Sequence, residues 1–185
     1  KYNDELEDYI EIPSDRVPFE QRPWMKSAEI TDRVIEAVES GEYDFIRINF
    51  PNGDMVGHTG IYQVVICAME ALDIVLGRLY RAVKKAGGIM VVSADHGNSD
   101  DMYEHDKKTG EVKRKEDGTP QGKTAHSLNP VPCIIVDPEG KKEGNAEYKE
   151  QLKEGLGISS LAATCIELLG FEPPEDYDPS VLVFS

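Results

Sequence analysis

The stretch that decides the fold is IMVVSADHGN, which runs from Ile89 to Asn98. Its first part, Ile89–Val92, is an unbroken apolar run, which is typical of a strand covered on both faces. Two potential metal ligands, Asp95 and His96, follow almost directly. Because ligands in α/β proteins bind beyond the carboxyl ends of the strands, this stretch predicts a buried strand that delivers functional side chains at its end.

Helices and strands alternate on both sides of this strand. Such an alternation, with short crossovers, predicts one α/β domain covering residues 1–185, with a mainly parallel sheet and helices on both of its faces. The expected elements are a helix from Ser27 that ends at Gly41, a strand at Asp44–Asn49, a helix from about Gly60 to Ala86, a strand at Val131–Val136 and a helix at Ser159–Leu169.

A polar, glycine-containing segment from Ser99 to Lys123 interrupts the alternation. We expect it to form a long loop or a small hairpin, and a loop of this length inside a compact domain is usually functional or mobile. Its two basic runs, at 107–108 and 113–115, are interpreted as a solvated face. The alternative is that they swing over an anionic substrate.

The charge of the chain limits its partners. Thirty-five acidic and 20 basic residues give a formal net charge of −15. A surface of this sign repels nucleic acid and anionic membranes, so we expect neither as a partner. A phosphorylated substrate would have to meet local positive charge, such as bound metal ions. No apolar run approaches the roughly 18–20 residues that a membrane span needs.

The three cysteines, Cys67, Cys133 and Cys165, lie in separate apolar stretches. Their odd number and wide spacing predict free core thiols in a reducing compartment rather than disulfides or zinc ligands. The polar first residues do not form a secretory signal, so we expect a cytoplasmic protein. Because the chain does not begin with Met, we also expect it to be a piece of a longer one.

Five potential metal ligands lie next to the predicted strands, where we expect them to share one edge of the sheet. A mixture of carboxylates and imidazoles suits Mn²⁺, Zn²⁺ or Fe rather than Ca²⁺, which prefers oxygen alone. Five ligands exceed the need of one catalytic ion, and two neighbouring ions can clamp a phosphoryl group. The residues are Asp54 and His58 after strand 44–49, Asp95 and His96 after strand 89–93, and His126 before strand 131–136.

Each of these residues also has a simpler interpretation. An isolated aspartate–histidine pair in a loop is more often a surface hydrogen bond than a metal site, and the same holds for His126 taken alone. The coincidence of three such segments at predicted strand ends favours the metal site. The fourth histidine, His105, lies in the polar segment and is expected to be solvated.

Three motifs carry a resemblance to a known family. They are Asn52–Gly60, Ser93–Asn98 and Thr124–Pro132. In this order and approximate spacing they resemble the signatures of cofactor-independent phosphoglycerate mutase, a member of the alkaline phosphatase superfamily. The resemblance covers nearly the whole chain and implies an alkaline-phosphatase-like three-layer sandwich, of which this chain would be the C-terminal part.

The resemblance also implies the ligand sets of two Mn²⁺ ions, with other divalent ions such as Zn²⁺ as alternatives. Asp54, His58 and His126 would hold one ion. Asp95 and His96 would belong to the other, whose remaining aspartate lies in an N-terminal segment of the family that this chain does not contain. One metal site therefore looks complete, and the second lacks half of its ligands.

The family interconverts 3-phosphoglycerate and 2-phosphoglycerate in glycolysis through a phosphoserine intermediate. The resemblance therefore implies phosphoglycerate as the substrate. The nucleophilic serine lies in the N-terminal segment of the family, and an inserted transferase domain supplies most of the groups that bind the glycerate. No residue here matches the nucleophile's motif, so we expect this piece alone to bind metal weakly and to be inactive as a mutase.

This chain differs from the family's motifs at one residue that, in the family, lies near the substrate phosphate. The family's usual motif is Ser-Pro-Lys-Val, with the lysine near the substrate phosphate, whereas this chain has Ser14-Asp15-Arg16-Val17. Arg16 keeps the positive charge and could bind phosphate through two hydrogen bonds. The alternative is an exposed loop arginine without a role.

Two other functions remain open at this point. One is a different metal-dependent phosphatase or a phosphopentomutase of the same superfamily, because fold and metals are shared while the substrate contacts are mostly absent. The other is a non-catalytic metal-binding module that keeps the fold without the nucleophile. The motif from Asn52 to His58 favours the mutase.

Overall fold

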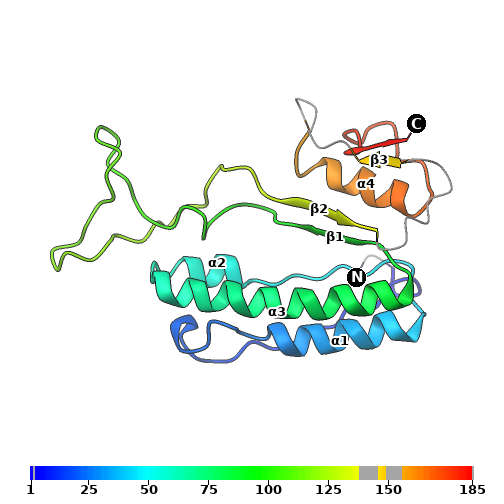
Figure 1. Ribbon diagram of the computed structural model, residues 1–185, viewed down its shortest axis with the longest axis horizontal. Coiled ribbons are helices and arrows are strands. Elements are labelled where there is room, and N and C mark those ends of the chain that lie inside the picture. The colour runs from blue at the N-terminus through cyan, green and yellow to red at the C-terminus, as the bar shows by residue number, and fades with distance from the viewer. Residues whose placement is uncertain (2, 138–145, 149–155, 185) are drawn as a thin grey trace. The chain divides into compact units, whose positions relative to one another are not determined.

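The structure is a computed structural model that describes residues 1, 3–137, 146–148 and 156–184. It divides into two compact units, Lys1–Ala82 with His96–Pro130 and Val83–Asp95 with Val131–Ser185. In chain order the elements are η1 (Phe19–Gln21), α1 (Ser27–Ser40), α2 (Asn52–Gly57), α3 (Tyr62–Ala86), β1 (Met90–Ser93), β2 (Cys133–Val136), β3 (Ala146–Tyr148), α4 (Ser160–Leu168) and β4 (Leu182–Phe184) (Figure 1).

The first unit is built around two long helices that lie side by side in Figure 1. The predicted helix from Ser27 is α1, and it ends as expected at Gly41, whose φ of 68° is the left-handed conformation that favours glycine. Asp32 of α1 accepts a hydrogen bond from the guanidinium of Arg78 on α3. An ion pair therefore joins the two helices at their surface.

The buried stripe of α3 holds the short helix α2 in place. Val65 and Ala68 of α3 form a core cluster with Val56 of α2 and with Met102. Val56 and Ala68 are completely buried. Because α2 carries Asp54, this apolar contact fixes one predicted metal ligand to the most regular part of the unit.

The short helix α2 was not predicted, because a loop was expected over these residues. Asn52 and Gly53 are typical of turns, and six residues are too few for a helical period to appear. Asn52 is buried and its amide donates a hydrogen bond to the carbonyl of Pro23. That contact is between residues 29 positions apart, so no local pattern could reveal it.

The second unit contains two antiparallel strand pairs. β1 pairs with β2 in the register Met90↔Val136 to Ser93↔Cys133, and β3 pairs with β4. The predicted mixture of helices and strands is confirmed, but a mainly parallel sheet is not. Parallel neighbours need a crossover, usually through a helix, whereas the described connection from β1 to β2 contains none.

Two further expectations about strands and cysteines are wrong for the described residues. The segment Asp44–Asn49 forms no strand, because no described segment pairs with it.

The three cysteines are free, as predicted, but Cys133 is exposed rather than part of a core. It lies at the exposed end of β2, where the described residues do not cover the sheet.

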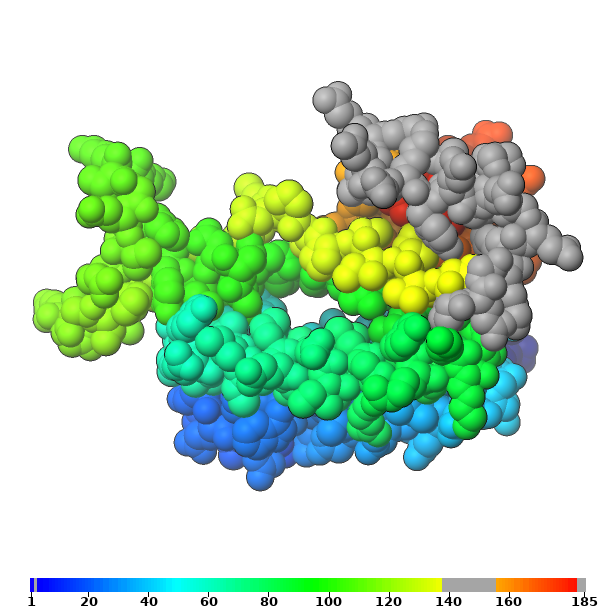
Figure 2. All heavy atoms as spheres, in the orientation of Figure 1, coloured from blue at the N-terminus to red at the C-terminus, as the bar shows by residue number. Residues whose placement is uncertain are grey.

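The polar segment 99–123, which we call the arm, belongs to the first unit. Its two sides meet in isolated antiparallel bridges at Tyr103↔Gly122, His105↔Val112 and Arg114↔Pro120. Most side chains beyond residue 105 are exposed, and Figure 2 shows the outer part of the arm, in light green, extending away from the helices of its unit. Met102, near the start of the arm, is buried in the core cluster. Within the described part of the chain, no helix is both long and apolar enough to traverse a bilayer.

Candidate metal centre

The helix α2 presents two of the predicted ligands on one side. Asp54 lies in its first turn, and His58 is the residue after its end, with the His58 amide donating to the Asp54 carbonyl at 3.0 Å. Residues four apart share a helix face. Accordingly, Nε2 of His58 lies 3.1 Å from Oδ1 of Asp54.

Two further imidazoles reach the same carboxylate from distant parts of the chain. Nε2 of His126 lies 3.1 Å from Oδ1 of Asp54. The rings of His96 and His126 are stacked with centroids 3.5 Å apart and planes 6° apart. Asp54, His96 and His126 each offer one ligand atom, and these atoms all lie within 4.8 Å of one another.

These distances fit a divalent ion. Ligand atoms that share one ion at bond lengths of about 2.1 Å are separated by about 3.0–3.4 Å, which is the separation of Asp54 from both His58 and His126. Carboxylate and imidazole together suit first-row divalent ions. The side chains of Asp54, His58 and His126 are 30%, 32% and 44% exposed, so the centre is open to a ligand from solvent.

Sequence reasoning missed one residue of this centre, Asn98. Its side chain is almost completely buried, at 6% exposure. Its amide nitrogen donates to Oδ1 of Asp54 at 2.8 Å and lies 3.0 Å from Nε2 of His58. The only signal in the sequence was its place two residues after His96. Asn98 orients Asp54 and His58 as an outer-shell partner does in metal sites.

The structure thus brings together Asp54, His58, His96 and His126. Asp95 is exposed and falls in the second unit, so its place in the site stays a prediction. His105, as expected, is partly solvated, with Nδ1 3.6 Å from Oδ1 of Asp101. The assignment of His96 to a separate ion also stays a prediction.

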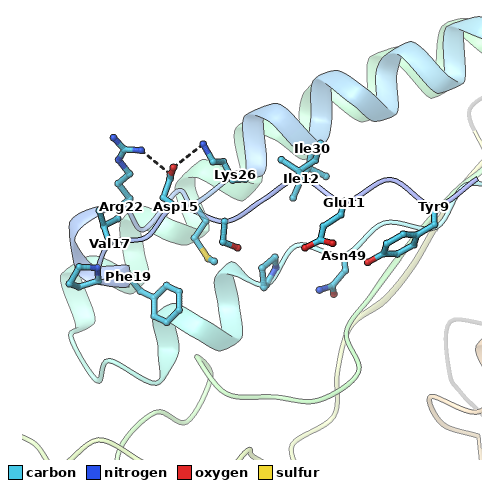
Figure 3. Close-up of a pocket in the computed structure, with 14 residues that line it drawn as sticks. Tyr9, Glu11, Ile12, Asp15, Val17, Phe19, Arg22, Lys26, Ile30 and Asn49 are labelled. Carbon is cyan, nitrogen blue, oxygen red and sulfur yellow. Dashed lines mark ion pairs between the residues drawn. The ribbon is translucent and has the colours of Figure 1, made fainter.

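A pocket of about 210 Å³ lies in the first unit, beside the loop that carries Arg16 (Figure 3). Asp15 lines it and pairs with Arg22 at 2.8 Å and Lys26 at 3.0 Å. Hydrogen bonds from Arg22 and Lys26 hold the pKa of Asp15 below its usual value. Arg16 does not line the pocket; it is exposed, and none of the described side chains pairs with it. Its contact with a phosphate stays a prediction.

The pKa of Asp15 predicts a pH-dependent contribution to stability. Because the folded pKa lies below the unfolded value of about 3.9, the contribution is complete above about pH 4 and is lost as the pH falls through the folded value. Urea unfolding of the chain and of Asp15→Asn should therefore differ more at pH 6 than at pH 3. Asp44→Asn, at an exposed carboxylate of the same unit, is the control. A difference that is equal at both pH values contradicts the ion-pair role.

Comparisons with known proteins agree with this geometry. The model of the Metalloenzyme superfamily matches residues 1–173. A 2,3-bisphosphoglycerate-independent phosphoglycerate mutase of Trypanosoma brucei brucei is 47% identical over 98% of this chain, and one of Arabidopsis thaliana is 41% identical over 98%. In both comparisons the chain covers 32% of the relative.

A solved structure is similar over the whole chain. The structure of Leishmania mexicana phosphoglycerate mutase at low cobalt concentration is 45% identical, with a TM-score of 0.91, over 100% of this chain and 33% of its own. The chain therefore spans about a third of the length of the proteins that it matches. Over that third it has the fold of a phosphoglycerate mutase.

Proposed function

Because the chain belongs to the Metalloenzyme superfamily, we propose that it is the metal-binding part of a phosphoglycerate mutase that interconverts 3-phosphoglycerate and 2-phosphoglycerate in glycolysis. The observation that carries the proposal is the approach of two imidazoles to one carboxylate, with Nε2 of His58 and Nε2 of His126 each 3.1 Å from Oδ1 of Asp54. The names of relatives at 40–47% identity favour the mutase over other enzymes of the superfamily.

The residues of the chain would divide between two divalent ions, with Mn²⁺ as the first candidate. Asp54, His58 and His126 would hold one ion, and Asp95 and His96 would contribute to the other. When bound, such ions neutralise phosphoryl oxygens and activate a hydroxyl nucleophile. The short contacts of Asp54 to two imidazoles support the first set.

The protein groups have distinct tasks in this proposal. The Asp54 carboxylate lowers the net positive charge of the centre, and Asn98 keeps that carboxylate turned toward His58. Arg16, which is exposed, would bind the substrate phosphate through two parallel hydrogen bonds. A serine that carries the phosphoryl group, the remaining ligand of the second ion and the groups that bind glycerate would come from outside these 185 residues.

We also propose that Asp44–Asn49 becomes a strand of a mainly parallel, three-layer sandwich when those other segments are present. Phe45 is 54% and Ile48 is 37% exposed. Apolar side chains of this size in a β-prone run are normally covered on a sheet face. One domain over residues 1–185 is part of this proposal.

A cytoplasmic location is consistent with the cysteines. All three are free, and burial raises the pKa of the Cys165 thiol, which favours the unreactive protonated form. Free thiols persist where the compartment is reducing.

Calorimetric titration of Mn²⁺ into the 185-residue chain tests the metal assignment. His58→Ala and His126→Ala should each weaken binding by about 10-fold or more, because even outer-shell changes at metal sites cost 10–100-fold. His105→Ala, in the arm, is the matched control and should bind like the parent chain. Unchanged affinity in both His58→Ala and His126→Ala contradicts the assignment. We expect the chain alone to show no mutase activity, and isomerisation at the rate of a full-length relative contradicts that part.

A further inference from the structure

Two loops carry the histidines of the metal centre, and the backbone joins them directly after each histidine. Gly97 and Ser127 form an antiparallel bridge, in which the amide of Ser127 donates to the carbonyl of Gly97 at 2.9 Å. Gly97 follows His96 and Ser127 follows His126. This backbone hydrogen bond therefore fixes the position of the His96 loop relative to the His126 loop.

The Asp100 carboxylate forms a second connection between the two loops, through side-chain hydrogen bonds. Oδ2 of Asp100 accepts a hydrogen bond from Oγ of Ser127 at 2.7 Å and another from Nδ2 of Asn129 at 2.6 Å. Ser127 is buried, at 6% exposure. Hydrogen bonds to an ionised carboxylate are shorter and stronger than those between neutral groups. Asp100 thus links the loop of His96 to the loop of His126 at two points.

The electrostatics of Asp100 agree with its being ionised in this position. Desolvation by the neighbouring atoms acts to raise the pKa, but the hydrogen bonds from Ser127, Asn129 and the backbone together outweigh that effect. The pKa of Asp100 consequently lies below its usual value. The carboxylate is therefore charged under all conditions in which a divalent ion would bind to neutral imidazoles.

The packing around Gly97 shows how closely the loops approach. A Cβ atom at Gly97 would lie 2.2 Å from Oγ of Ser127 and 2.6 Å from Oδ1 of Asp100. A side chain at this position would displace the Ser127 hydroxyl and the Asp100 carboxylate, which link the two loops. Separation of the loops would also separate the stacked rings of His96 and His126.

We propose that Asp100 is a positioning residue of the metal centre, which holds the loops of His96 and His126 in register without binding the ion itself. The inference rests on the proposed function, because it gives the two histidines a ligand role. The carboxylate oxygen that faces the second loop is already used by Ser127 and Asn129. Asp100 is also not a member of the group formed by Asp54, His96 and His126.

The experiment compares Asp100→Ala with the conservative variant Asp100→Asn in the 185-residue chain. Asparagine keeps an oxygen of the same size that can accept both hydrogen bonds, so it should retain the Mn²⁺ affinity within a few-fold. Alanine should weaken it by about 10–100-fold, the usual cost of an outer-shell loss. Asp117→Ala is the matched control, because Asp117 also accepts two hydrogen bonds in a loop, both from Thr119.

A second readout needs no metal. Because the rings of His96 and His126 are stacked, each is expected to shift the imidazole proton resonances of the other in the metal-free chain. Asp100→Ala should move these resonances toward those of isolated histidines, and Asp100→Asn and Asp117→Ala should leave them in place. If Asp100→Ala does not fold, Ser127→Ala can replace it, because this variant removes one of the two hydrogen-bond donors. It is expected to move the imidazole resonances in the same direction as Asp100→Ala, by a smaller amount.

The outcomes separate the two proposals. If Asp100→Ala melts at a lower temperature but keeps both the affinity and the imidazole resonances, the residue is merely structural and the inference is wrong. If the parent chain binds no Mn²⁺ but the resonances respond as expected, the proposed function fails while the positioning stands. If His126→Ala loses affinity and Asp100→Ala does not, the inference alone fails.

Discussion

Replacing Asp54 by alanine is expected to reduce Mn²⁺ binding by more than about 100-fold, the largest effect of any single ligand. The predicted histidine ligands each offer one nitrogen, whereas Oδ1 of Asp54 lies 3.1 Å from the Nε2 atoms of both His58 and His126. Loss of an outer-shell partner already costs 10–100-fold. Removal of the negative charge itself leaves neutral imidazoles to hold a divalent cation.

The control for Asp54→Ala is Asp73→Ala, at an exposed carboxylate on α3 of the same unit. It removes the same charge from the same net-negative chain, so it corrects for any general attraction of cations to the surface. Calorimetric titration gives the affinities, and far-UV circular dichroism shows whether each variant keeps its helices. Equal affinities for the two variants would mean that the ion binds elsewhere.

The second large effect is expected at Gly57, where alanine should lower the free energy of unfolding by about 1–3 kcal/mol, the usual cost of overpacking. A Cβ atom there would lie 2.4 Å from Oδ1 of Asn98 and 2.8 Å from Oγ of Ser99. Asn98 cannot move aside freely, because its amide is bound to Asp54 and lies against His58. The variant should therefore also weaken Mn²⁺ binding.

Gly53 provides the matched control for Gly57, because both glycines belong to α2. A Cβ at Gly53 would meet only the methyl carbon of Met69, at an ordinary 3.6 Å. Alanine is favoured over glycine in a helix by about 1 kcal/mol, so Gly53→Ala should be neutral or slightly more stable. Urea unfolding measures both variants. If Gly57→Ala is as stable as Gly53→Ala, the close packing of Asn98 on α2 is wrong.

The parts of the fold that the sequence predicted are those with a local physical cause. The apolar stripe that includes Ala68, Val75 and Leu79 required a long helix, and the positive φ of Gly41 was implied by the end of the preceding helical pattern. The strands at Met90–Ser93 and Cys133–Val136 follow from short apolar runs. Their antiparallel pairing could have been anticipated from the missing crossover helix between them.

The candidate centre was predictable only in part, for the same reason. The four-residue spacing of Asp54 and His58 already favours contact, and the histidines at 96 and 126 stood out because the chain has only four. The roles of Asn98 and Asp100 arise from contacts between residues 27 to 44 positions apart. Such contacts depend on the exact approach of two loops, which residue patterns do not specify.

The base of the arm has a consequence for how the family can change. Lys123 donates from its backbone to the carbonyl of Met102 at 2.8 Å, and its ammonium group lies 2.5 Å from Asp101. The arm is therefore fastened at its root, between the two histidine loops and the mostly exposed outer part at residues 106–118. Insertions and deletions between residues 106 and 118 alter only the closed outer part, at a small entropic cost for added length. The length and the charge of the arm can therefore change during evolution while the distance between the two histidine loops stays the same.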